Sequence, residues 1–256
     1  MSIRPFNGLF MLLLLLTAIS IAVIRRLRKR PKKQRTGFLL ILCIFNILFY
    51  SVYKCLLSVD QEFMLISQLE HFNWFNELPL QLCNVNLFLI PAGLLSQKRS
   101  ILGFSFFTAP LGAAMALLFP ESAFVGYSLM LPRIFGFYLT HILLIICGLS
   151  LSALGFYRPQ RKDFPGIIAA FVILAFSAHL VNTLFRYTVC PQANYFFTYG
   201  ADISLLNLFW KLIPIPFLYE LPALLILLCY MVIIEFFFCW AERLSRRRME
   251  KFSIYS

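Results

Sequence analysis

The chain has 256 residues, of which 61% are hydrophobic and only 13% are charged, and its formal net charge is +12. A soluble domain carries roughly 25% charged residues, so the composition excludes a soluble globular protein and predicts one membrane domain over residues 1–256. The basic residues lie beside apolar stretches, where they orient the chain in a membrane and contact anionic lipid. We therefore expect no nucleic-acid partner.

Seven apolar stretches follow one another, and each is about long enough to cross a hydrocarbon core of roughly 30 Å as a helix. They cover residues 7–24, 37–57, 78–95, 101–119, 133–154, 164–185 and 217–240. The predicted fold class is therefore all-α, a polytopic membrane protein with seven transmembrane helices. The first stretch has no small-residue cleavage site and its basic cluster follows it, so we interpret it as a retained span rather than a signal peptide.

The segments between these stretches differ in charge, and the difference predicts the topology. Alternate segments hold 18 Lys and Arg on one side and 5 on the other, and eight of the 18 lie within residues 25–35. Under the positive-inside rule this places the N-terminus outside and the C-terminus in the cytoplasm. We expect an integral multi-pass membrane protein, located in the plasma membrane if the chain is bacterial.

The third stretch carries the most unusual polar pattern. Over residues 78–86 it reads LPLQLCNVN, which places Pro79 in the first turn and Gln81, Cys83, Asn84 and Asn86 in an otherwise apolar helix. Polar groups on two faces cannot meet lipid broadly, so we expect this helix at the centre of the bundle. The alternative to a functional role for the three amides is interhelical hydrogen bonding. The alternative for Cys83 is packing as a small buried apolar residue.

Three later stretches carry polar residues near the same expected end. These are Tyr138 and His141 in the fifth stretch, His179, Asn182 and Arg186 in the sixth, and Glu220 at the start of the seventh. At about 1.5 Å per residue, Cys83, His141, His179 and Glu220 would lie within roughly 5–13 Å of the outer boundary. We therefore expect a polar cavity open to the outer leaflet, with Arg186 at its mouth to contact a phosphate.

At these residues the chain resembles the YwaF family of integral membrane proteins, together with eukaryotic transmembrane relatives described as cysteine-dependent phospholipid acyltransferases. The matching pieces are LPLQLC at 78–83, Thr140 with His141, and ANYF at 193–196, and the resemblance covers about residues 36–240. Many members carry His where this chain has Gln81, which questions an acid–base or metal role for that position. The resemblance implies seven spans and, for the eukaryotic branch, transfer of a fatty acyl group between lipids.

The first functional hypothesis is a membrane-embedded lipid acyltransferase. Cys83 would be the nucleophile that accepts an acyl group as a thioester, and His141 would be the base that forms the thiolate. We expect no metal and no cofactor, membrane phospholipids as partners, and no protein partner that the sequence identifies. The remaining site residues would bind substrate or the developing oxyanion: Gln81, Asn84, Asn86, Tyr138, His179, Asn182, Arg186 and Glu220.

The second hypothesis belongs to another class, a seven-helix carrier or receptor that binds a small polar ligand or a lipid headgroup without chemistry. The seventh stretch has no central lysine for a retinal Schiff base, so a rhodopsin-like receptor is not favoured. A third hypothesis is haem ligation by His141 and His179. Thioester trapping at Cys83 separates the first two hypotheses, and an absorbance spectrum of the purified protein tests the third.

The charge asymmetry makes the topology testable. We expect a cysteine introduced within residues 25–35 to be shielded from a membrane-impermeant maleimide in intact cells, and to be labelled after the membrane is permeabilised. A cysteine placed within residues 186–216 should be labelled without permeabilisation. Labelling of the 25–35 segment from outside would overturn the predicted orientation, together with the expected depth of the polar residues.

Overall fold

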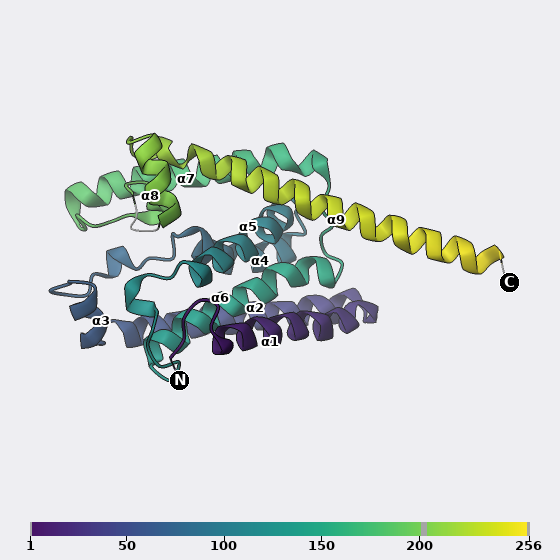
Figure 1. Cartoon of the computed structure of the whole chain (residues 1–256), viewed down its shortest axis with the longest axis horizontal. Helices are drawn as coiled ribbons and strands as arrows, with labels where there is room; N and C mark the ends of the chain where they lie inside the picture. Colours follow the sequence, from purple (N-terminus) through teal and green to yellow (C-terminus); the bar gives the residue numbers. More distant parts are fainter. Residues whose placement is uncertain (1, 201–203, 255–256) are drawn as a thin grey trace.

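The computed structural model describes residues 2–200 and 204–254, and their regular structure is helical apart from one isolated β-bridge between Ser2 and Ser128. Figure 1 shows the α-helices in their order along the chain. They are α1 Gly8–Arg26, α2 Lys32–Leu57, α3 Gln61–Ile66, α4 Leu82–Ser96, α5 Arg99–Leu118, α6 Pro132–Ala153, α7 Phe164–Thr188, α8 Ser204–Leu212 and α9 Leu221–Ile254. Short 3₁₀ turns join several of them, among them Ser122–Phe124, Tyr195–Phe197 and Leu218–Glu220.

Within the described residues, six helical segments are long and apolar enough to cross a membrane. They cover Gly8–Lys29, Lys32–Leu57, Arg99–Leu118, Pro132–Ala153, Arg161–Thr188 and Leu218–Leu244. The prediction of an all-α membrane protein is thus confirmed, and six of the seven expected spans are found as such helices. Two expected boundaries differ: α9 continues to Ile254, beyond the expected end at residue 240, and α2 begins at Lys32 inside the basic segment, directly after Pro31. Lys and Arg favour helices, and proline is tolerated where a helix starts.

The seventh expected span, residues 78–95, has a different form. Its helix, α4, begins only at Leu82 and has 15 residues, so it is about 22 Å long and shorter than a hydrocarbon core. The preceding residues, including Pro79, are irregular, and Gln81 is the N-terminal cap. The expectation that Pro79 lies in the first turn of the helix is therefore wrong, and residues 78–81 take up part of the expected span as non-helical chain.

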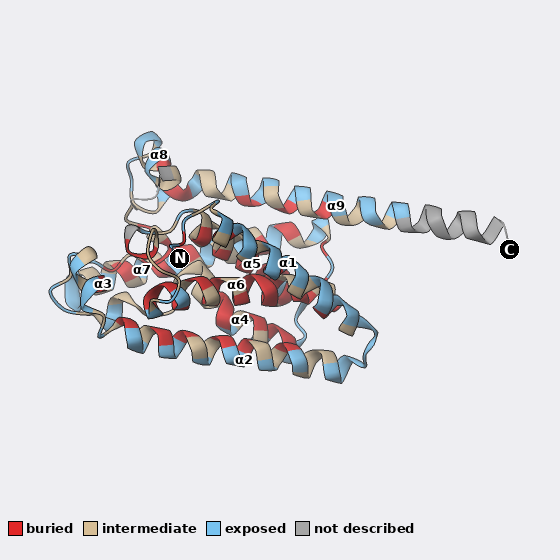
Figure 2. Ribbon diagram, turned by 60° about the horizontal axis from the view of Figure 1, so that its bottom comes forward, coloured by how far each residue is buried: buried red, intermediate tan, exposed pale blue. Residues whose placement is uncertain are grey.

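The bundle is organised around α5 and α6. Helix α6 packs against α1, α2, α4 and α5, and α4 also contacts α2 and α5, which agrees with the central position expected for it. Nine consecutive residues of α5, from Leu102 to Pro110, are buried. A helix that is buried all round belongs in the interior. Helices α1, α2 and α9 instead keep exposed outer faces (Figure 2), and many of the exposed residues are large and apolar.

The helices form three layers in Figure 1, with α4 and α5 between a layer of α1, α2 and α6 and a layer of α7, α8 and α9.

Opposite ends of the bundle differ in charge. Arg99 pairs with Asp163 at 2.7 Å and Arg158 pairs with Glu242 at the end where α2 begins. Lys54 lies near the other end of α2, 19 residues or about 28 Å from Arg35.

The contact between α2 and α6 depends on a glycine. A Cβ atom on Gly136 would lie 2.1 Å from the ring of the buried Tyr53, so only glycine lets the two helices approach this closely. We expect Gly136→Ala to lower the free energy of unfolding by about 1–3 kcal/mol, since overpacking displaces side chains or backbone.

Thermal unfolding in detergent micelles measures this effect. Gly37→Ala on α2 is the matched control, because nothing lies within 4 Å of a Cβ atom there. Alanine in a helix is favoured by roughly 0.5–1 kcal/mol over glycine, so the control should be neutral or stabilising. Equal melting temperatures for the two variants would contradict the proposed constraint on helix approach.

Candidate functional site

A cavity of about 480 Å³ lies between the central helices and the segment that leads into α9. Its lining is mainly apolar and includes several polar and charged side chains. Five of the ten residues selected from the sequence line it: Gln81, Cys83, Asn84, His141 and Glu220. The other five, Asn86, Tyr138, His179, Asn182 and Arg186, are not among the lining residues. The cavity therefore brings the proposed nucleophile and base to one space, and divides the expected substrate residues into two groups.

Cys83 lies in the first turn of α4, because the helix begins at Leu82. The first N–H groups of a helix have no partner within it, and the first hydrogen bond here runs from Val85 N to Gln81 O at 2.9 Å. The N–H groups of Cys83 and Asn84 lie beside the Cys83 sulfur. A helix N-terminus favours negative charge, so this position suits a thiolate better than a mid-helix position would.

The Cys83 side chain belongs to a short hydrogen-bonded chain. Its thiol contacts Asn84 Oδ1 at 3.6 Å, and Asn84 Nδ2 donates to the Tyr50 hydroxyl at 3.3 Å. The Tyr50 hydroxyl in turn donates to the Glu77 carbonyl at 3.3 Å. Because Tyr50 uses its proton on Glu77, the amide nitrogen of Asn84 faces Tyr50 and its oxygen faces the sulfur.

His141 has one ring nitrogen engaged with the backbone. Its Nδ1 lies 2.7 Å from the Phe137 carbonyl, which can only accept, so Nδ1 carries the proton and Nε2 keeps the lone pair of the neutral ring. The Phe137 ring packs against the imidazole with centroids 4.5 Å apart. An oriented neutral imidazole beside a cavity is the arrangement that a general base requires.

An ion pair that the sequence reasoning did not select also lines the cavity. Lys54 pairs with Glu77, and its Nζ lies 5.6 Å from the Tyr50 ring centroid and 5.2 Å from that of Tyr53. The spacing of Tyr50, Tyr53 and Lys54, which share one face of α2, is the signal that could have found them.

Two amide side chains, those of Gln81 and Asn182, hydrogen-bond to the irregular segment that closes the cavity, residues 189–200 after α7. Gln81 Nε2 donates to Asn194 O at 3.2 Å, and its Oε1 accepts from Phe196 N at 2.8 Å. On the other side, Asn182 donates to Tyr195 O at 2.8 Å and accepts from Tyr195 N at 2.7 Å. Phe196 has a left-handed backbone, with φ of 56°. We call the contacts of Gln81 and Asn182 with this segment the amide clamp. The clamp gives both side chains a structural role.

His179 and Arg186 lie away from the cavity, which corrects the expectation that His179 shares the pocket and that Arg186 stands at its mouth. His179 Nδ1 contacts Thr198 Oγ1 at 3.1 Å, and Arg186 Nη1 donates to Ala193 O at 3.2 Å. The Arg186 guanidinium also lies 4.6 Å from the Tyr199 ring centroid. Both side chains thus bind the irregular segment. The two histidines do not line one cavity, so the geometry expected for bis-histidine haem ligation is not formed.

Asn86 and Tyr138 are interior packing residues. Asn86 is fully buried, and its Nδ2 donates to Leu82 O at 2.8 Å and to Thr108 Oγ1 at 3.1 Å. Both amide protons are therefore used between α4 and α5, which leaves none for an oxyanion. The Tyr138 side chain is only 1% exposed and lies outside the cavity lining.

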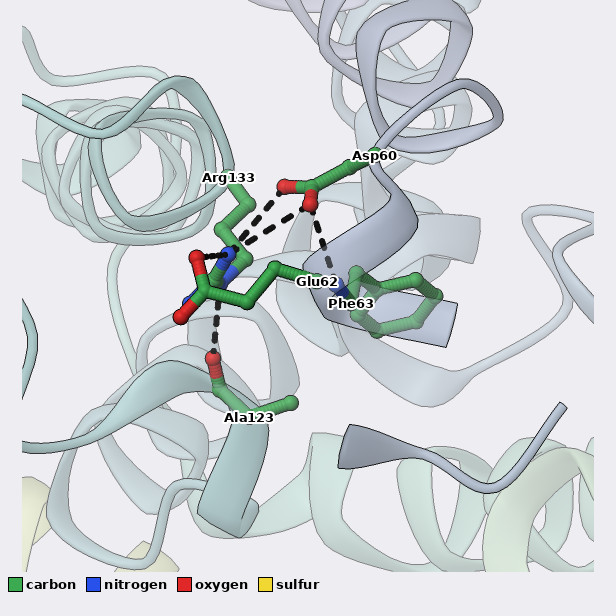
Figure 3. Close-up of polar contacts among 5 residues, drawn as sticks. All are labelled: Asp60, Glu62, Phe63, Ala123 and Arg133. Carbon is green, nitrogen blue, oxygen red and sulfur yellow. Dashed lines mark hydrogen bonds and ion pairs between the residues drawn. The ribbon is translucent and has the colours of Figure 1, made fainter. Parts of the chain in front are cut away.

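A buried arginine braces the end of the bundle that carries α3. Figure 3 shows Arg133 between two carboxylates, with Nη1 2.8 Å from Glu62 and 3.3 Å from Asp60. Its Nε donates to the Ala123 carbonyl at 3.3 Å. The hydrogen bond from Arg133 lowers the pKa of the exposed Glu62 carboxyl. Arg133 thereby connects α6 to α3 and to the turn at 122–124.

This brace positions an aromatic wall of the cavity. Asp60 also accepts from Phe63 N at 2.9 Å, which caps α3. Phe63 packs on Phe124 with centroids 5.9 Å apart, and Phe124 stacks on Phe137 at 4.6 Å. All three rings line the cavity, and the last one contacts His141.

Three buried polar atoms of lining residues have no hydrogen-bond partner among the described residues. They are Tyr53 Oη, Thr140 Oγ1 and Glu220 Oε1, in side chains that are 4%, 2% and 8% exposed. Buried polar groups are nearly always paired, and an unpaired one costs about 1–3 kcal/mol. A ligand or ordered water in the cavity would supply the missing partners.

A comparison with models of protein families matches residues 3–245 to the family described as the TMEM164 family. The match does not carry the YwaF name that the motifs suggested. No curated protein matches the chain, and no solved structure does. The family match and the six apolar helices show an integral, multi-pass membrane protein.

The amide clamp predicts a local effect of substitution at Gln81. We expect Gln81→Leu to speed amide hydrogen exchange over residues 190–200 and to lower the free energy of unfolding by about 1–3 kcal/mol, because Phe196 N–H and Asn194 O lose their partner. Gln81→Glu should have a smaller effect, since it keeps the acceptor for Phe196. The exposed Gln61 on α3 supplies the control substitution. Unchanged exchange in Gln81→Leu would show that the clamp does not hold the segment.

Proposed function

The chain belongs to the TMEM164 family, and we propose that it is a membrane-embedded lipid acyltransferase with Cys83 as its nucleophile. One observation carries the proposal: Cys83, in the first turn of α4, and His141, with an oriented neutral ring, line the same mainly apolar cavity. The volume of about 480 Å³ falls within the roughly 300–1,000 Å³ of small-molecule sites.

In the first half-reaction His141 Nε2 takes the proton from the Cys83 thiol. The thiolate attacks an ester carbonyl of a phospholipid and forms a C–S bond, and the carbonyl electron pair moves to oxygen. When this tetrahedral intermediate collapses, the ester C–O bond breaks, and the departing lysolipid alkoxide takes the proton back from the imidazolium. The products are a Cys83 thioester and a neutral lysolipid hydroxyl.

The second half-reaction reverses these steps with a different lysolipid. His141 removes the proton from its hydroxyl, the oxygen attacks the thioester carbonyl, and the C–S bond breaks. The Cys83 thiolate then takes the proton from the imidazolium. The acyl group has moved between two lipids with no change in oxidation state and no need for a cofactor.

Backbone N–H groups are better placed than side-chain amides to stabilise the oxyanion of both intermediates. The amide donors of Gln81, Asn84 and Asn86 contact Asn194, Tyr50, Leu82 and Thr108. The free N–H groups of Cys83 and Asn84 lie beside the sulfur, near any carbonyl that bonds to it. A Cβ atom on Gly112 of α5 would lie 3.6 Å from Cys83 N, so the glycine keeps this space open.

The second candidate function is a carrier or receptor without chemistry. The observation in its favour is that Tyr53, Thr140 and Glu220 line the cavity and each carries a buried polar atom without a partner among the described residues, which a bound ligand could satisfy whether or not Cys83 reacts. The two functions differ in one measurable property, a covalent acyl adduct on Cys83.

Substitution of the nucleophile tests the proposed chemistry. We expect Cys83→Ser and Cys83→Ala to lose nearly all acyl exchange between lipids in reconstituted vesicles, since a hydroxyl needs far stronger base assistance than a thiol. His141→Ala should lose about 10²–10⁴-fold, and the double variant should be little worse than either single one. Mass spectrometry of the Cys83 peptide should show an acyl adduct.

The exposed Cys229 on α9 provides the matched control, because Cys229→Ser removes a thiol that does not line the cavity. It should keep full activity and show no adduct. Full acyl exchange by Cys83→Ala would end the acyltransferase proposal and leave the carrier or receptor as the better reading.

A further inference from the structure

We propose that Lys54 and the Tyr53 hydroxyl bind the phosphate of the lipid that enters the cavity. The inference deepens the proposed function, since the identity of the ligand as a phospholipid rests on it. The sequence had assigned headgroup contact to Arg186, which lies outside the cavity lining. Lys54 takes that place because it is the one Lys or Arg among the described residues that line the cavity.

The ammonium group of Lys54 is sheltered but not saturated. Its side chain is 14% exposed and that of its partner Glu77 is 15% exposed, so the pair lies at the cavity rather than in open solvent. An ammonium group has three N–H donors, and the described contacts supply one carboxylate and two aromatic faces. Lys54 can therefore donate to a further anion while Glu77 holds the side chain in place.

Tyr53 supplies an independent sign of a missing ligand. Its hydroxyl is buried without a partner, and its ring is fixed in position by close contact with Gly136 of α6. The Lys54 ammonium lies over that same ring, so cation and hydroxyl belong to one corner of the cavity. A phosphate satisfies both, because it carries negative charge and several strong acceptor oxygens.

The position of this corner fits the chemistry at Cys83. Lys54, Cys83 and His141 line the same cavity. In a phospholipid only a few covalent bonds separate the phosphate from the nearest ester carbonyl. A lipid whose phosphate contacts Lys54 can thus place that carbonyl at Cys83 while its acyl chain occupies the apolar part of the lining, which includes Met115 and Ile226.

Two lipids that differ only by a phosphate test the assignment. The purified full-length protein in detergent micelles is titrated with oleoyl lysophosphatidic acid and with monooleoylglycerol, and with inorganic phosphate in a third arm. The wild-type protein should bind the phosphate-bearing lipid at least about tenfold more tightly than the neutral one. Since a hydrogen bond to a charged group is worth about 10- to 100-fold in affinity, Lys54→Gln should lose that preference and leave monooleoylglycerol binding unchanged.

Further variants separate binding from misfolding. Lys54→Arg should retain most of the preference, and Tyr53→Phe, which keeps the ring that packs on Gly136, should reduce it several-fold. Arg186→Gln is the matched control and should bind both lipids as the wild type does. If Lys54→Gln does not fold, Tyr53→Phe and Lys54→Arg decide the question, because an unchanged preference in Tyr53→Phe or a lost one in Lys54→Arg contradicts the subsite.

The remaining outcomes are equally decisive. A preference retained by Lys54→Gln, or lost in Arg186→Gln, overturns the proposal. Inorganic phosphate that competes fully with the lysolipid at equal concentration would show a site for free anion rather than for a lipid headgroup. Cys83→Ala should keep the wild-type preference for the phosphate-bearing lipid while it loses acyl transfer. A wild-type protein that shows this preference but transfers no acyl group would refute the enzyme and leave the phosphate subsite intact.

Discussion

An irregular chain segment packed among membrane helices must find partners for its backbone N–H and C=O groups, and the whole site depends on how residues 194–198 meet this constraint. Such groups are costly to leave unpaired where water is scarce. Gln81 and Asn182, from opposite sides, supply the partners that secondary structure would otherwise provide. With the segment held there, Phe196 and Phe197 form part of the cavity lining, and the chain can lead on to Glu220.

The same interaction explains why Cys83 has unusual surroundings for a cysteine in an apolar helix. Gln81 turns its side chain to the segment and caps α4 with an extended backbone, with ψ of 151°, so the helix cannot start earlier. In a helix that ran from residue 78, the N–H of Cys83 would be bonded to a carbonyl four residues back. The late start exposes the first-turn N–H groups at the sulfur, and the shortness of α4 follows from the same contact.

Apolar length was sufficient to predict six of the seven expected spans, because burial in hydrocarbon imposes a minimum length. Depth along each helix also predicted that Cys83 and His141 share a cavity. Helical periodicity could not predict where the Arg186 side chain lies. Its partner Ala193 belongs to an irregular segment, and the path of such a segment does not follow from a helical repeat. Lys54 was overlooked because it had been counted as a topological charge, and the start of α4 was misplaced because Pro79 fits the first turn of a helix equally well.

The clamp between Gln81 and Asn194 joins positions 113 residues apart, and this separation has a consequence for biosynthesis. A chain made at roughly 5–20 residues per second needs about 6–23 seconds to extend from one to the other. By the end of that interval α4 and α6 have been made, whereas α8 and α9, which supply one wall of the cavity, have not. The nascent protein therefore carries an open groove in which Cys83 faces bulk lipid, and a chaperone or lipid that covers it has seconds in which to act.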